Sequence, residues 1–382
     1  MAPASSRRRS RPSTASTPKP ITVVPGSIPR MMRSQGTFPG TVPGLLLAAC
    51  SSCGCTMAAR RPLLMVFRWG VFLLACVFLY VKLAGPKGIV ATDGARLLAM
   101  LAANRAVLLV VVALMLLNWL VESGKWRVLM AEVEPVGPWR AFVATIAGTS
   151  VGFVSLNRTG EFIGRVFFLA PENRIAGGFA TALGSIAQFV VTLAAGGVGL
   201  FVLTTAGIPL PWPAGWTSWI LATLTALVTA IALVLYLYPG LFRQLLLLVP
   251  FIQRFGHASA VLARFPRSRS LGVLVLSLVR YVLFTFQFVL LLRTFGAGVG
   301  AWEAAAGVPL VYLIATLIPS VMLTELGVRG SVEVAVLEPM GGEASIVLLA
   351  TTCLWMINVA FPACIGSVIL VSARIRTRNG TA

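Results

Sequence analysis

Residues 148–165 read GTSVGFVSLNRTGEFIGR: an apolar half, a polar turn, and then a glutamate and an arginine four residues apart. Four residues are about one helical turn, so Glu161 and Arg165 share one helix face. These charges interrupt the otherwise apolar segment 141–169, and an uninterrupted lipid-facing helix would not carry them. The segment therefore predicts a hairpin or broken helix that enters a membrane and turns back.

A second segment, 304–337, repeats this pattern. Its centre, residues 314–329, reads IATLIPSVMLTELGVR and ends in Glu325 and Arg329, again four residues apart. Glu333 extends the same face by a further four residues. Paired broken helices in two halves of a chain are typical of transporters built from inverted repeats. We expect two re-entrant hairpins related in this way.

The flanking sequence is that of a polytopic membrane protein. Of its 382 residues, 58% are hydrophobic and only 11% are charged, whereas soluble domains are nearer a quarter charged. A bilayer core takes about 20 apolar residues, and six runs meet or approach that length: 63–83, 106–121, 176–203, 218–238, 271–292 and 345–372. The predicted fold is all-α, with six transmembrane helices and two hairpins.

Basic residues set the expected orientation. They crowd the loop between the fourth and fifth runs, and we place that loop and both termini in the cytoplasm by the positive-inside rule. Residues 1–62 predict a disordered Ser/Pro/Arg-rich tail, in which Met57 is an alternative start. Residues 63–376 form the membrane domain, and 377–382 a cytoplasmic tail. The net charge of +20 lies largely in the tail and between apolar runs, so nucleic-acid binding is not expected.

The charges within the membrane segments are the candidate site. On insertion scales each costs roughly 2.5–3.5 kcal/mol at the bilayer centre. Two readings remain open: the Glu–Arg pairs lock the hairpins, or the arginines bind a lipid phosphate, whose oxygens suit guanidinium geometry. Arg280 lies halfway along its predicted span. Gln188 belongs to a stripe of polar residues on one helix face, which indicates a water-filled groove. The candidate substrate-binding residues are Glu161, Arg165, Gln188, Arg280, Glu325, Arg329 and Glu333.

At the two hairpins the sequence resembles the lysylphosphatidylglycerol synthase transmembrane-region family, also called flippase-like integral membrane proteins. The resemblance rests on TGEFIGR at 159–165 and on LIPS at 317–320 followed by TELGVRG at 324–330. It implies movement of a polar-headed lipid, anionic or aminoacylated, between the leaflets of a bacterial plasma (inner) membrane. The family's soluble aminoacyl-transferase domain has no counterpart here, so synthase activity is not expected.

Three functions follow from these patterns. The first is a lipid flippase or transporter whose partner is a membrane phospholipid. The second is an integral-membrane transferase acting on a lipid-linked substrate, and the third is a non-catalytic partner of a separate lipid-modifying enzyme. The chain has one histidine and no P-loop motif, so no metal, nucleotide or other cofactor is expected. Assembly into a homo-oligomer remains open.

Overall fold

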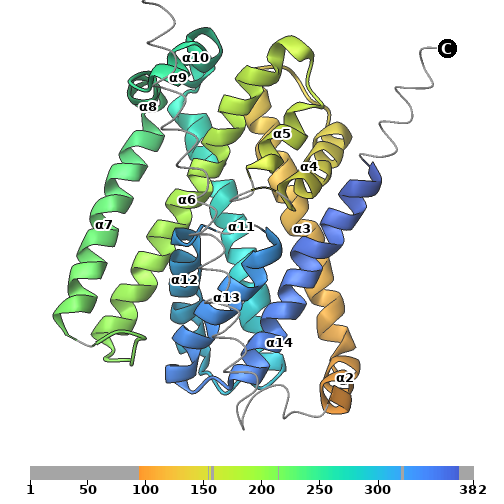
Figure 1. Cartoon of the computed structure of the whole chain (residues 1–382), viewed down its shortest axis with the longest axis vertical. Coiled ribbons are helices and arrows are strands. Elements are labelled where there is room, and N and C mark those ends of the chain that lie inside the picture. The colour runs from red at the N-terminus through yellow and green to blue at the C-terminus, as the bar shows by residue number, and fades with distance from the viewer. Residues whose placement is uncertain (1–93, 154, 156–158, 214, 320–321, 370–382) are drawn as a thin grey trace, which may run out of the picture. The chain divides into compact units, whose positions relative to one another are not determined.

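The computed structural model describes residues 94–369, apart from 154, 156–158, 214 and 320–321. Every regular element within these residues is a helix (Figure 1). The main helices are α2 (Gly94–Ala103), α3 (Arg105–Met130), α4 (Pro138–Phe153), α5 (Gly160–Val166), α6 (Arg174–Thr205), α7 (Trp216–Leu237), α8 (Pro239–Leu247), α9 (Pro250–Gln253), α10 (Gly256–Arg264), α11 (Arg267–Thr294), α12 (Ala301–Leu317), α13 (Met322–Leu337) and α14 (Ala344–Trp355).

Five helical segments in the described chain are long and apolar enough to cross a membrane. They are α3, α6 with the short turn before it, α7, α11, and α14 with its continuation to Ile369 through a π-helical turn. Five of the six predicted runs are thus confirmed as long apolar helices. The sixth run, 63–83, lies outside the described residues, as do the tails 1–62 and 377–382. The architecture is that of an all-α membrane protein.

The two interrupted segments fold as helical hairpins, α4 with α5 and α12 with α13. Their helices have 16, 7, 17 and 16 residues, short of the roughly 20 that a bilayer core requires. In the first turn, Ser155 accepts a hydrogen bond from the Gly160 amide and donates one to the Gly152 carbonyl. In the second, Pro319 follows the end of α12, where proline restricts the preceding residue to extended backbone.

The hairpins occupy different ends of the helix bundle. The α4–α5 hairpin lies at the same end as α8–α10, whereas the α12–α13 hairpin reaches in from the opposite end (Figure 1). The long helix α11 runs between these two ends and passes both hairpins.

Glycines allow the closest helix contacts. A Cβ added to Gly164 of α5 would lie 2.6 Å from the Gly148 Cα of α4, so only glycine permits this approach within the first hairpin. A Cβ on Gly199 of α6 would lie 2.4 Å from the Ala306 carbonyl oxygen of α12. Small residues at such crossings are typical of helix packing in membranes, where dispersion contacts replace the hydrophobic effect.

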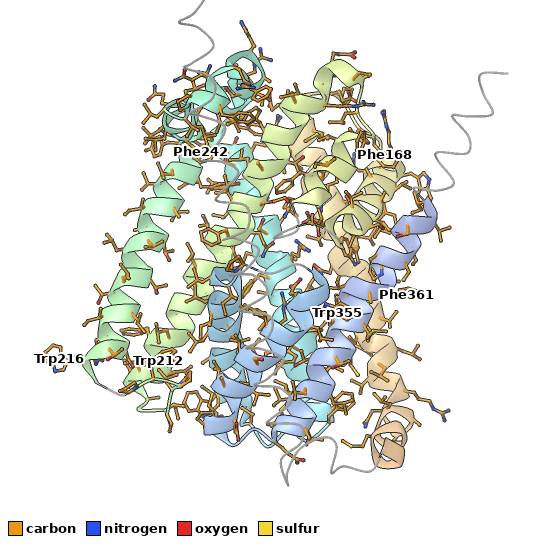
Figure 2. All side chains as sticks on the ribbon, viewed as in Figure 1. Phe168, Trp212, Trp216, Phe242, Trp355 and Phe361 are labelled. Carbon is orange, nitrogen blue, oxygen red and sulfur yellow. The ribbon has the colours of Figure 1, made fainter. Side chains whose placement is uncertain are left out.

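The outer surface is apolar along the length of the bundle. On α7, large aliphatic side chains such as Ile220 and Leu227 are more than half exposed, and only three of its residues are buried. Trp212 and Trp216 lie at one end, and Phe168 and Phe242 toward the other (Figure 2). A soluble monomer rarely exposes so extended an apolar face. Tryptophan is enriched at membrane–water interfaces, so Trp212 and Trp216 fit a bilayer interface at their end of the bundle.

Candidate functional site

Charged side chains gather inside the described bundle, between the two hairpins. Four are basic and four acidic: Lys125, Arg165, Arg280, Arg329, Glu122, Glu161, Glu325 and Glu333. Five of these residues are buried, and Arg280, Glu325 and Arg329 are partly exposed. Because isolated charges are costly in an apolar interior, the arrangement of their partners decides which of them can serve a ligand.

Glu122 of α3 is the hub of the first cluster. Its Oε1 atom lies 2.7 Å from Arg165 Nη1, and its Oε2 atom lies 2.7 Å from Lys125 Nζ and 3.2 Å from Arg280 Nη1. Glu161 supplies the second carboxylate, with its Oε2 atom 3.2 Å from Arg165 Nη2. Three cations and two carboxylates leave this group, which we call the Glu122 cluster, with a formal charge of +1.

The Glu122 cluster joins three helices. Lys125 is one helical turn from Glu122, whereas Arg165 comes from α5 and Arg280 from α11. Arg280 also lies over the Trp119 ring, with its guanidinium carbon 5.9 Å from the ring centroid. The carboxylate of one helix thus forms ion pairs with a hairpin and with a second long helix.

The second cluster lies on α13. Arg329 Nη2 is 2.5 Å from Glu325 Oε1, one helical turn earlier. The Arg329 guanidinium carbon also lies 5.6 Å from the ring centroids of both Phe284 and Tyr312. Glu333 is directed elsewhere: it is fully buried and accepts a hydrogen bond from the Thr351 hydroxyl of α14. The three charges predicted to share one helix face therefore have two different environments.

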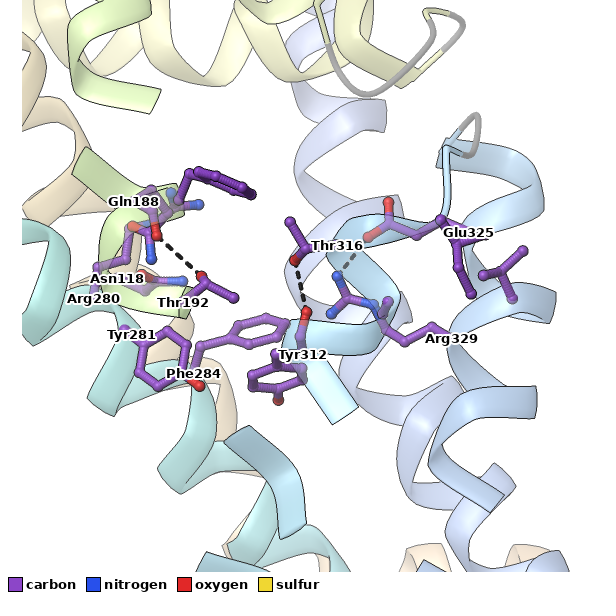
Figure 3. Close-up of a pocket in the computed structure, with 14 residues that line it drawn as sticks. Asn118, Gln188, Thr192, Arg280, Tyr281, Phe284, Tyr312, Thr316, Glu325 and Arg329 are labelled. Atoms are coloured by element: carbon purple, nitrogen blue, oxygen red, sulfur yellow. Dashed lines mark hydrogen bonds and ion pairs between the residues drawn. The ribbon is translucent and has the colours of Figure 1, made fainter. Parts of the chain in front are cut away.

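A cavity of about 450 Å³ separates the two clusters. It is lined by side chains from α3, α6, α11, α12 and α13, including Asn118, Gln188, Thr192, Arg280, Tyr281, Phe284, Tyr312, Thr316, Glu325 and Arg329. Arg280 lies on one side with Asn118 and Gln188, and Arg329 lies on the other with Glu325 (Figure 3). Two guanidinium groups thus reach one cavity inside an apolar bundle.

The sequence-predicted residues divide into two groups. Four of them line the cavity and come from α6, α11 and α13: Gln188, Arg280, Glu325 and Arg329. Glu161, Arg165 and Glu333 are not among the cavity-lining residues, because each is buried against partners on a neighbouring turn or helix. For Arg165, predicted as a phosphate ligand, both terminal nitrogens already bind carboxylates.

Sequence reasoning missed several cavity residues. Asn118 showed a signal, because it recurs with Glu122 and Lys125 at helical spacing on one face of α3. The sequence contains no signal for the aromatic residues of the lining, because aromatic residues in apolar runs ordinarily indicate packing. These residues are Tyr281, Phe284 and Tyr312. The polar residues of α6 divide in the same way: Gln188 and Thr192 line the cavity, whereas Thr181 accepts a hydrogen bond from the Trp126 indole.

Comparisons with protein-family models, curated proteins and solved structures found no match to this chain.

Proposed function

We propose that this protein is a lipid transporter that moves the polar headgroup of an anionic phospholipid across the membrane through the cavity between the hairpins. The observation that carries the proposal is the position of Arg280 and Arg329 on opposite sides of one cavity. Guanidinium groups offer planar, charge-assisted hydrogen bonds that match phosphate oxygens. The acyl chains stay in the lipid during this movement.

The energetics favour a role for the cavity in transport. A single charge near the bilayer centre costs roughly 2.5–3.5 kcal/mol on insertion scales, and the headgroup of a lipid faces the same barrier when it crosses. A polar cavity with two guanidiniums replaces the lost water by fixed donors. Arg280 and Arg329 are held by Glu122 and Glu325, so the cavity is organised before the lipid arrives.

The arrangement of the hairpins supports alternating access. Hairpins from opposite ends of the bundle, each ending near a central polar site, are expected of an inverted repeat in which one half moves against the other. The Glu-x-x-x-Arg motif in each hairpin and the resemblance to flippase-like membrane proteins support the same function. We propose that α4–α5 and α12–α13 form the two halves of such a repeat.

Charge at the two ends supports one orientation. The end that holds α8–α10 also holds α4, the C-terminal end of α3 and the first turns of α6 and α11 (Figure 1). These segments contain most of the basic residues of the described chain: Arg127, Arg140, Arg174, Arg243, Arg254, Arg264, Arg267 and Arg269. The opposite end contains Glu303, Glu338 and Glu343, with Arg105 and Arg293. By the positive-inside rule we place the α8–α10 end in the cytoplasm of a bacterial plasma membrane.

Lipid movement in proteoliposomes tests the proposal. Vesicles with a tail-labelled anionic phospholipid are treated with a membrane-impermeant quencher, and the wild type is compared with the double variant Arg280→Gln, Arg329→Gln. Arg293→Gln is the matched control, since Arg293 is an exposed residue of the last turn of α11. We expect the double variant to lose movement and the control to keep it.

The outcomes separate the candidate functions. Wild-type movement no faster than that of empty liposomes, for every headgroup, would overturn the proposal and favour the transferase or the non-catalytic partner. Unchanged movement in a folded double variant would overturn the role of the two arginines. Circular dichroism and gel filtration in detergent establish that each variant is folded.

A further inference from the structure

We infer that the cavity selects a phosphodiester whose headgroup is neutral and hydroxylated, such as glycerol or a sugar, over headgroups that carry an ammonium. This inference rests on the proposed function and goes beyond it by naming the substrate class. Three properties of the cavity lining support it: its charge, its aromatic faces and its uncharged polar groups.

The charged groups of the lining favour a single negative charge. Arg280, Arg329 and Glu325 are its charged residues within the described chain, which gives the lining a formal charge of +1. Glu325 is already bound to Arg329 at 2.5 Å. An ammonium would need a carboxylate of its own, whereas a phosphodiester supplies one negative charge and leaves the lining neutral.

The aromatic faces of the lining are also unsuited to a quaternary ammonium. Cages for choline-like groups place open ring faces around the cation. Here the Arg329 guanidinium already lies over Phe284 and Tyr312, 5.6 Å from each centroid. A second cation near these rings would be repelled by Arg329, so the aromatic wall is selective against it.

The uncharged polar groups fit hydroxyls. The buried side-chain oxygen atoms of Asn118, Gln188 and Tyr312 have no hydrogen-bond partner in the part of the chain that the structure describes. Asn118 is itself 3% exposed, and buried polar groups are rarely left unpaired in proteins. An amide both donates and accepts, as a hydroxyl does, so the two can satisfy each other whichever way the amide is turned.

Thr192 and Thr316 add acceptors to this lining. Each donates its hydroxyl proton to a backbone carbonyl one turn earlier, at 3.0 and 2.6 Å, so its oxygen remains able to accept. Asn118 and Gln188 lie on the same side of the cavity as Arg280 (Figure 3). A phosphate bound at Arg280 therefore brings the hydroxyls of its headgroup next to these amides.

The test compares headgroups in the proteoliposome assay. Tail-labelled phosphatidylglycerol and phosphatidylinositol are compared with phosphatidylethanolamine, phosphatidylcholine and lysyl-phosphatidylglycerol at equal lipid content. We expect the two hydroxylated anionic lipids to move at least about tenfold faster, which corresponds to roughly 1.4 kcal/mol of discrimination. Equal rates for all five lipids would overturn this inference and leave the proposed transport intact, whereas movement of none would overturn the transport itself.

A substitution of near-equal volume provides a second test. Gln188→Glu adds one negative charge to the lining, so its formal charge falls from +1 to zero and the preference for hydroxylated anionic headgroups should fall severalfold toward ammonium lipids. Gln253→Glu in α9 is the matched control, because Gln253 is exposed and lies outside the cavity. A headgroup preference unchanged by Gln188→Glu would contradict the inference.

Soluble compounds distinguish the headgroup from its phosphate alone. The purified wild type in detergent is heated with glycerol 3-phosphate, inorganic phosphate or ethanolamine phosphate. Greater thermal stabilisation by glycerol 3-phosphate than by the other two is the expected result, since it combines the phosphate with free hydroxyls. Equal stabilisation by inorganic phosphate would show that the amides and hydroxyls contribute no selectivity and would overturn this part of the inference.

Discussion

Replacing Glu122 by glutamine should destabilise the protein more than replacing any carboxylate at the ends of the bundle. The change preserves the size of the side chain and removes the charge that holds Lys125, Arg165 and Arg280 at 2.7, 2.7 and 3.2 Å. The formal charge of the Glu122 cluster rises from +1 to +2, and three cations are left with Glu161 as their remaining carboxylate.

The magnitude follows from burial. Removing one partner of a buried ion pair costs about 3–5 kcal/mol, because an uncompensated charge stays in the apolar interior. The side chains of Glu122 and Lys125 are 4% and 3% exposed, so solvent screens them little. Glu132→Gln is the matched control: its ion pair with Arg269 is partly exposed, and such pairs contribute about 0–1 kcal/mol.

Unfolding in mixed micelles with increasing dodecyl sulfate measures these differences. We expect Glu122→Gln to lower the free energy of unfolding by about 3–5 kcal/mol and Glu132→Gln by less than about 1 kcal/mol. Adding Lys125→Met to Glu122→Gln removes one excess cation, so the double variant should be less destabilised than the sum of the single variants. Two results would refute the role of Glu122 as the shared partner of the three cations. One is an equal loss of stability in Glu122→Gln and Glu132→Gln, and the other is a double variant whose loss equals the sum of the two single variants.

Two further predictions concern helix packing, and the same unfolding measurement checks both. Gly199→Ala should destabilise the protein by about 1–3 kcal/mol through its clash with the Ala306 carbonyl, whereas Gly178→Ala, with no atom within 4 Å of the added Cβ, should not destabilise it. Thr351→Val removes the hydroxyl that donates a hydrogen bond to Glu333, and it should lower the free energy of unfolding by about 1–3 kcal/mol. Thr351→Ser keeps a hydroxyl and should be nearly neutral. Equal effects within either pair would contradict the contact concerned.

The long helices could be predicted from the sequence because each is a run of apolar residues of membrane length. The predicted run 218–238 and the observed α7, Trp216–Leu237, differ by only one or two residues at each end. The hairpins could also be predicted, because charged residues, glycines and Pro319 interrupt segments that are otherwise apolar. These are local properties, and they need no knowledge of which helices are neighbours.

The length of α3 was harder to predict from the sequence. The predicted run ended at residue 121, because Glu122 and Lys125 are expected at the end of an apolar span, but the helix continues to Met130. Their charges are tolerated inside the bundle because Arg165 and Arg280 lie 43 and 158 positions away in sequence and beside them in space. Partners at such separations cannot be identified from one sequence.

The same long-range contacts decide which arginines line the cavity. Sequence symmetry paired Arg165 with Arg329, because both end a Glu-x-x-x-Arg motif. Arg165 is 5% exposed at its side chain and binds carboxylates through both terminal nitrogens, whereas Arg280 is 19% exposed and lines the cavity. The two motifs therefore have different surroundings: that of the first hairpin is buried against Glu122, and that of the second, with Arg280 opposite, borders the cavity. Because Glu122 binds both Arg165 and Arg280, it links the packing of the first hairpin to the position of a cavity arginine.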